Sequence, residues 1–159
     1  MKNAENFTGS VSRADRRKKM KKVAVVYFSQ TGNTEEMAAV VKDSLEGKAE
    51  AVLIPCDQFT SSDVGSYDAF AFGCPAMGNE VLEEDSFEPM FTALEGLLEG
   101  KDVVLFGSYG WGDGEWMRSW NERCLSDKIV VKADPVICQE SPDENTKDAL
   151  KALAEALIA

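Results

Sequence analysis

Histidine is absent from this chain of 159 residues, and its four cysteines include no CxxC pair. Zinc sites and general bases draw chiefly on these two side chains, so a zinc site or a histidine-based catalyst is not expected. Long apolar runs are also missing, because no stretch approaches the roughly 20 residues that a membrane-spanning helix needs. These absences predict a cytoplasmic, single-domain protein without a membrane partner, whose cysteines are buried free thiols: Cys56, Cys74, Cys124 and Cys138.

Positive charge is scarce beyond the first 22 residues. Residues 1–22 hold eight Lys/Arg and two acids, a net charge of +6, which leaves 9 basic and 26 acidic side chains, net −17, in residues 23–159. Because residues 1–20 are polar and show no hydrophobic periodicity, we expect them to form a mobile basic extension ahead of a folded domain, residues 21–159. A basic arm that touches nucleic acid or a membrane is the alternative for this extension, whereas the acidic domain predicts no nucleic-acid partner.

The most informative run is SQTGNT, residues 29–34, which joins the apolar segment Val23–Phe28 to an amphipathic helix. A strand, a hydroxyl-rich turn and a helix start in this order gather backbone N–H groups around a volume that suits a phosphate. No Lys or Arg lies between Val23 and Val41, so neutral donors would hold a phosphate monoester rather than a triphosphate with magnesium. Neither a Walker GxxxxGK[ST] motif nor GxGxxG is present. A turn that only caps the helix is the alternative.

Apolar strand-like segments alternate with amphipathic helix-like segments from Val23 onward. The strand candidates are Val23–Phe28, Ala51–Pro55, Ala69–Cys74, Val103–Gly107 and Ile129–Cys138, the last interrupted by Pro135. The helix candidates are Thr34–Leu45, Phe87–Leu98, Glu115–Leu125 and Glu144–Ile158, and Cys56–Asp68 has room for a short helix at most. This alternation predicts an α/β fold, a three-layer, doubly wound parallel sheet of five strands. Ligands bind such sheets at the carboxyl ends of the strands, which directs attention to the loops after strands one, three and four.

The loops after the third and fourth strands read CPAMGNEVLEE and GSYGWGDGEWM, residues 74–84 and 107–117. Each places one large flat or polarizable side chain, Met77 or Trp111, among small residues. Such a pair can sandwich a planar ring. The alternative for Trp111 is an aromatic ring packed on its own loop, and for Met77 a filler of the core.

The three runs SQTGNT, AMGNEVLEE and GSYGWGDG together resemble those of a flavodoxin of the short-chain kind, and the similarity extends from about Met20 to the C-terminus. The resemblance implies the strand order 2-1-3-4-5 and non-covalent FMN. It implies that the phosphate lies in residues 29–34, the isoalloxazine between Met77 and Trp111, and the pyrimidine edge near Glu80. The implied cofactor-binding residues are Ser29, Gln30, Thr31, Gly32, Asn33, Thr34, Ala76, Met77, Gly78, Asn79, Glu80, Ser108, Tyr109, Gly110, Trp111 and Gly112.

A flavodoxin carries single electrons, and the residues suggest how this chain would do so. A flip of the Gly78–Asn79 peptide would offer a carbonyl to the protonated flavin N5 of the semiquinone, and Asn79 suits the positive-φ position of a type II turn. Acidic side chains near the ring, among them Glu83, Glu84 and Asp85, would disfavour the anionic hydroquinone. A solvated helix entry is the alternative role for these three acids. We therefore expect a low-potential, monomeric carrier that shuttles between semiquinone and hydroquinone and meets redox partners through their basic docking faces.

Two other functions stay open. An FMN-dependent quinone or nitro reductase would transfer two electrons as hydride, which needs space over a ring that Met77 and Trp111 would cover. A phospho-acceptor receiver domain shares the five-stranded fold but needs aspartates at the strand ends. The first and third strands here end in YFS and GCP, without carboxylates. The sequence therefore favours an electron carrier over an enzyme.

Overall fold

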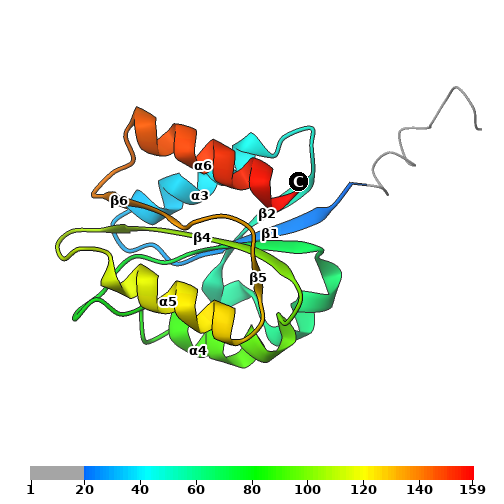
Figure 1. Ribbon diagram of the computed structural model, residues 1–159, viewed down its shortest axis with the longest axis horizontal. Coiled ribbons are helices and arrows are strands. Elements are labelled where there is room, and N and C mark those ends of the chain that lie inside the picture. The colour runs from blue at the N-terminus through cyan, green and yellow to red at the C-terminus, as the bar shows by residue number, and fades with distance from the viewer. Residues whose placement is uncertain (1–19) are drawn as a thin grey trace, which may run out of the picture.

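The computed structural model describes residues 20–159, so the expected basic extension lies almost wholly outside the described residues. The helices and strands follow one another in regular alternation along this part of the chain (Figure 1). In chain order they are β1 (Lys22–Tyr27), α3 (Asn33–Ser44), β2 (Glu50–Pro55), η1 (Cys56–Gln58), η2 (Ser61–Ser66), β3 (Ala69–Gly73), α4 (Phe87–Leu94), η3 (Glu95–Leu97), β4 (Asp102–Tyr109), α5 (Glu115–Ser126), β5 (Val130–Val131), β6 (Val136–Gln139) and α6 (Glu144–Leu157).

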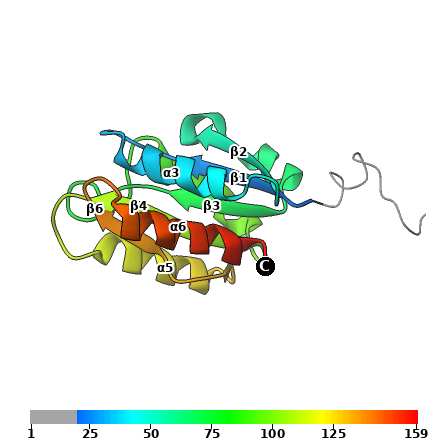
Figure 2. The same ribbon diagram turned by 90° about the horizontal axis from the view of Figure 1, so that it is seen from above.

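The strands form one parallel sheet in the order β2-β1-β3-β4-β5, as predicted. Helices α3 and α6 cover one face of this sheet, and α4 and α5 cover the other, which gives the three layers seen in Figures 1 and 2. The order reverses between β1 and β3, where the chain passes from one side of β1 to the other. In sheets of this kind the reversal opens a crevice outside the carboxyl ends of the strands.

The last strand differs from the expected single segment, residues 129–138. It consists of two short strands, β5 and β6, and both pair in parallel with β4. Val130 lies opposite Asp102, whereas Val136 lies opposite Phe106. Pro135 stands directly before β6 and has no N–H for the ladder, which explains why pairing stops and starts again. The interruption still leaves the carboxyl end of β6 at the same edge as that of β4.

The two faces of the sheet are packed by side chains of different size. On β3, Phe70 and Phe72 belong to the core under α4 and α5, whereas Ala69 and Ala71 belong to the core under α3 and α6. All four side chains are fully buried. Side chains alternate across a strand, so a strand buried on both faces reads as the continuous apolar run that the sequence showed.

The predicted helix over residues 87–98 divides into α4 and the short 3-10 helix η3. Gly96 lies in this second part, and a glycine inside a helix weakens it by up to about 1 kcal/mol relative to alanine. The four cysteines are free and buried, as predicted, and burial raises the pKa of the Cys138 thiol to about 11. Within residues 20–159, no helix is long and apolar enough to cross a membrane.

Candidate functional site

A pocket opens at the carboxyl edge of the sheet, where the loops after β1, β3 and β4 meet. Its walls combine hydroxyls and amides with a few apolar groups. They consist of Ser29, Gln30, Thr31, Asn33, Thr34, Pro75, Ala76, Met77, Ser108, Tyr109, Gly110 and Glu140. Segments far apart in the sequence thus supply one small volume, at the place where the sheet order predicts a ligand.

The loop after β1 is held by its own serine. Ser29 Oγ accepts hydrogen bonds from the backbone N–H groups of Gly32 and Glu35, both at 3.1 Å. Gly32 precedes α3 with φ 98°, a left-handed conformation that glycine adopts without strain. The first N–H groups of a helix have no acceptor within it, and they lie at the positive end of the helix dipole. The loop therefore presents Asn33 and Thr34 to an anion.

One buried hydrogen bond joins this loop to the end of β4. Thr34 Oγ1 and Ser108 Oγ lie 3.0 Å apart, and both side chains are almost completely buried. The two residues are 74 positions apart in the sequence. Because the bond is inside the protein, it fixes the height of α3 against the sheet and the position of both hydroxyls in the pocket.

The loop after β3 closes on itself. Met77 and Val81 exchange two backbone hydrogen bonds, of 2.9 and 3.0 Å, around the three residues 78–80. The expectation that Asn79 holds the positive-φ position is wrong, because Gly78 (φ 51°) and Glu80 (φ 57°) hold such positions instead. A three-residue hairpin loop commonly ends in one left-handed residue, and here that residue is Glu80.

Glu80 connects this loop to the loop after β4. The Asp113 N–H donates to Glu80 Oε2 at 3.3 Å. A Cβ atom on Gly112 would lie 2.5 Å from the Glu80 carboxylate, so only glycine leaves the carboxylate in place. Glu80 Oε1 is buried and has no hydrogen-bond partner in the described part of the chain. A buried carboxylate oxygen without a donor is costly, and it marks a place for a ligand N–H.

Two aromatic residues at the end of β4, Tyr109 as its last residue and Trp111 in the loop that follows, lie differently. Tyr109 lines the pocket, and its ring centroid is 5.6 Å from that of Trp116 on α5. Trp111 is 64% exposed and lies outside the pocket wall. Such exposure is high for the largest apolar side chain, and it leaves the indole available to a planar ligand.

The family model for flavodoxin matches residues 25–152 of this chain. The chain belongs to the flavodoxin family. It is 42% identical to a flavodoxin of Clostridium beijerinckii over 128 residues, 80% of this chain and 93% of the relative. It is also 42% identical to the flavodoxin of Megasphaera elsdenii over 135 residues, 84% of this chain and 96% of the relative. The solution structure of that protein in its two-electron reduced form covers 86% of this chain and 98% of its own, with a TM-score of 0.79.

Flavodoxins carry electrons on FMN, so the family assigns this chain that cofactor and that role, and does not favour the reductase alternative. The residues present fit FMN. The neutral donors of the loop after β1 suit its phosphate, and the unpaired Glu80 Oε1 is an acceptor for an N–H of the ring. When bound, FMN supplies the one-electron chemistry, which no side chain of this flavodoxin provides by itself.

The structure brings ten of the predicted residues into the pocket wall: Ser29, Gln30, Thr31, Asn33, Thr34, Ala76, Met77, Ser108, Tyr109 and Gly110. The other six lie in the same three loops outside this wall: Gly32, Gly78, Asn79, Glu80, Trp111 and Gly112. Sequence reasoning missed Pro75 and Glu140. Glu140 follows β6, and its N–H donates to the Tyr109 carbonyl at 2.9 Å. The carboxyl end of the last strand was the signal that would have found it.

Glu83 is not a solvated acid at the start of a helix, which was the alternative role that the sequence left open for it. It is only 6% exposed, and its carboxylate accepts from the N–H groups of Asp85, Ser86 and Phe87 at 2.9, 2.9 and 2.7 Å. It also accepts from Ser86 Oγ at 2.8 Å. Burial alone would raise the pKa of Glu83, but these donors lower it below the ordinary value. Glu83 thus fastens the end of the loop after β3 to the start of α4.

Proposed function

We propose that this flavodoxin works at low potential, moving single electrons between the half-reduced and fully reduced states of FMN. The observation that carries the proposal is the crowding of acids beside the pocket. One carboxylate oxygen from each of Glu80, Asp113 and Glu115 lies within 4.8 Å of the others, and Glu140 lines the pocket itself. One carboxylate at about 10 Å costs an added electron about 1.7 kcal/mol at an effective dielectric near 20, or roughly 70 mV.

The proposed residue roles are those that the resemblance to flavodoxins implies. Residues 29–34 hold the phosphate, and Ala76 and Ser108 lie beside the ribityl chain. Met77 and Trp111 flank the ring, and the cofactor would cover the exposed indole of Trp111. Glu80 Oε1, which is without a partner, accepts from the pyrimidine edge, next to Gly110 and Gly112.

Gly78 serves as the proton-linked element of the site. With FMN bound, the Gly78 carbonyl would be the acceptor for a hydrogen bond from the flavin N5 when that nitrogen is protonated. Gly78 has φ 51°, and a Cβ atom on it would meet nothing within 4 Å. A glycine there permits the backbone rotation that a turn of the Gly78–Asn79 peptide needs. One neutral hydrogen bond contributes about 1 kcal/mol, which corresponds to roughly 40 mV for one electron.

The partners are redox proteins with basic docking faces, and the protein acts as a monomer in the cytoplasm. Residues 23–159 carry a net charge of −17, which attracts such faces over a distance comparable with the Debye length. Raising the salt concentration from 0.01 to 1 M should therefore slow electron transfer to a basic acceptor. Rates that stay constant over this range would contradict electrostatic steering.

Potentiometry of the FMN-loaded protein under anaerobic conditions tests the proposal. We expect two separate one-electron steps, the second far more negative than that of free FMN, with a long-wavelength absorption band between them. One two-electron step without this band would overturn the proposal and favour the quinone or nitro reductase. Steady-state oxidation of NADPH with a quinone would then check that alternative.

A further inference from the structure

A second hollow, of about 270 Å³, lies on the other side of the loop after β3, away from the pocket described above. The pocket touches this loop through Pro75, Ala76 and Met77, whereas the hollow touches it through residues 79–82. The rest of the hollow comes from α4 and α5: Glu88, Glu115, Trp116, Ser119, Trp120 and Arg123. Because Glu80 lines the hollow and is also proposed to contact the flavin, a group seated here would lie directly beside the flavin site.

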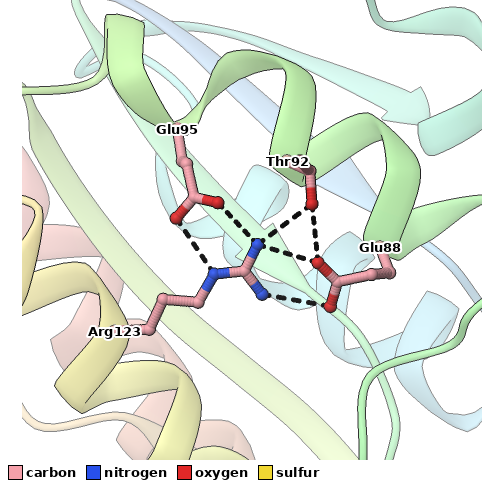
Figure 3. Close-up of polar contacts among 4 residues, drawn as sticks. All are labelled: Glu88, Thr92, Glu95 and Arg123. Carbon is pink, nitrogen blue, oxygen red and sulfur yellow. Dashed lines mark hydrogen bonds and ion pairs between the residues drawn. The ribbon is translucent and has the colours of Figure 1, made fainter.

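Arg123 holds Glu88, one of the acids of this hollow, through the polar contacts drawn in Figure 3. Its Nη2 lies 2.8 Å from Glu88 Oε2 and 2.7 Å from Glu95 Oε1, and its guanidinium carbon is 5.1 Å from the centroid of the Phe91 ring. Burial alone would raise the pKa of Glu88, but hydrogen bonds from Arg123 and Thr92 lower it. Glu88 thus stays ionised at neutral pH, and two carboxylates already share the charge of Arg123.

Negative charge is left over in the hollow. Glu80, Glu88 and Glu115 line it against the one guanidinium, and no lysine from the described residues reaches it. Glu115 is exposed, and no ion pair within residues 20–159 involves it. Its carboxylate is crowded by those of Glu80 and Asp113. The base is apolar, because Leu82, Trp116 and Trp120 are almost fully buried, and a low dielectric strengthens attraction to a cation.

We propose that this hollow is the socket for one arginine side chain of the redox partner. Its aliphatic stem packs against Val81, which is exposed at the rim, and its guanidinium binds the carboxylate of Glu115, which no ion pair of the described residues involves. Arginine fits better than lysine because its planar fork binds carboxylates through two parallel hydrogen bonds. The inference rests on the proposed electron carriage, and it names the point at which the basic partner anchors beside the cofactor.

Titration of the FMN-loaded protein with N-acetyl-arginine methylamide, followed by NMR, tests the socket directly. We expect saturable shifts at the Ser119 amide and at the indole N–H groups of Trp116 and Trp120. The citrulline analogue, which has the same shape without the charge, should cause none. Equal shifts with both compounds, or shifts centred elsewhere on the surface, would overturn the proposal.

Two matched pairs of variants on α5 separate the socket from general charge. Glu115→Gln should weaken binding of the arginine probe about two- to fivefold, as expected for one partly exposed ion pair, whereas Glu122→Gln, seven residues further along, should not. Ser119→Arg should abolish binding, because the new side chain occupies the hollow, whereas Ser126→Arg should retain it. Equal effects within either pair would refute the socket.

Electron transfer provides a second measurement. The reduced protein is mixed with excess oxidised cytochrome c, a basic acceptor, in a stopped-flow instrument. Ser119→Arg should slow the reaction several-fold more than Ser126→Arg, although both change the net charge equally. If the arginine probe caused no saturable NMR shifts while potentiometry showed two one-electron steps, the socket alone would be overturned. If the arginine probe caused saturable shifts while potentiometry showed one two-electron step, the proposed function would be overturned and the arginine site would be retained.

Discussion

Glu83 provides the sharpest test of how the loop after β3 is held in place. Replacing it by glutamine keeps the size of the side chain but removes its charge, and the amide nitrogen then faces N–H donors. The carboxylate accepts four hydrogen bonds at the start of α4, three of them from backbone N–H groups and one from Ser86 Oγ. Glu83 Oε1 accepts three of these bonds and Oε2 accepts the bond from the Asp85 N–H. A glutamine oxygen in the place of Oε1 therefore keeps three weaker, neutral bonds, and the bond from Asp85 is lost.

The magnitude follows from bonds to a charged, buried group. A bond to a charged group contributes about 1.5–3 kcal/mol and a neutral bond about 1 kcal/mol, so losing one bond and weakening three should lower the free energy of unfolding by about 3 kcal/mol. For a domain of this size, that corresponds to a fall of about 6–12 °C in the melting temperature. Urea unfolding at pH 7, followed by far-UV circular dichroism, measures the difference.

The pH dependence gives the same experiment a second readout. The donors hold the pKa of Glu83 in the folded state below its ordinary value of 4.5, which the unfolded chain retains. The stability that its ionisation contributes is therefore fully present above pH 4.5 and is lost as the pH falls through the lower, folded pKa. The difference in the free energy of unfolding between wild type and Glu83→Gln should therefore become smaller as the pH falls through this range.

Glu84→Gln is the matched control, since Glu84 is exposed and belongs to the same loop. It should change the free energy of unfolding by less than about 0.5 kcal/mol. If Glu83→Gln had as small an effect, or kept the wild-type slope of stability against pH, the capping role of Glu83 would be refuted.

Three further changes have defined outcomes. Gly112→Ala would push away the Glu80 carboxylate, which a Cβ atom would approach at 2.5 Å, and should weaken FMN binding at least tenfold in a fluorescence titration; unchanged affinity would contradict the role of Glu80. Thr34→Val breaks the bond to Ser108 and removes a hydroxyl from the proposed phosphate site, so FMN should bind about tenfold more weakly, whereas riboflavin, which lacks the phosphate, should be affected less. Arg123→Met leaves two carboxylates facing each other and should destabilise the fold by about 2 kcal/mol in urea, an effect that high salt reduces.

The layout of the fold could be predicted because its signal is local. A strand buried on both faces is apolar at every position, as in Val23–Val26, and its helices carry apolar stripes, so alternation along the chain is enough to predict a covered parallel sheet. The site followed from the same logic, since loops that leave one edge of a sheet meet there. Ten predicted residues indeed share one pocket wall.

What could not be predicted depends on contacts between distant segments. Glu83 reads like its neighbours Glu84 and Asp85, and only the way the chain turns into α4 decides which of the three is buried. The side-chain preference of asparagine predicts a left-handed conformation at Asn79. The pairing of Met77 with Val81 sets the loop geometry instead, and it gives the left-handed conformation to Glu80. Glu140 carries no motif, and only the register of β6 brings it to the pocket.

The small side chains on one face of β3 have a consequence for how the protein tolerates change. Ala69 and Ala71 separate the sheet from α3 and α6 by the smallest side chains that an apolar strand offers, and α3 begins at the loop after β1, which is proposed to hold the phosphate. Enlarging either alanine would lift that helix and with it the loop. In a deep mutational scan selected for flavin retention, substitutions at Ala69 and Ala71 should therefore be as harmful as substitutions at residues of the pocket wall, although neither alanine lines the pocket. In such a scan, the spacing between the sheet and α3 would affect flavin retention as strongly as a direct contact with the ligand.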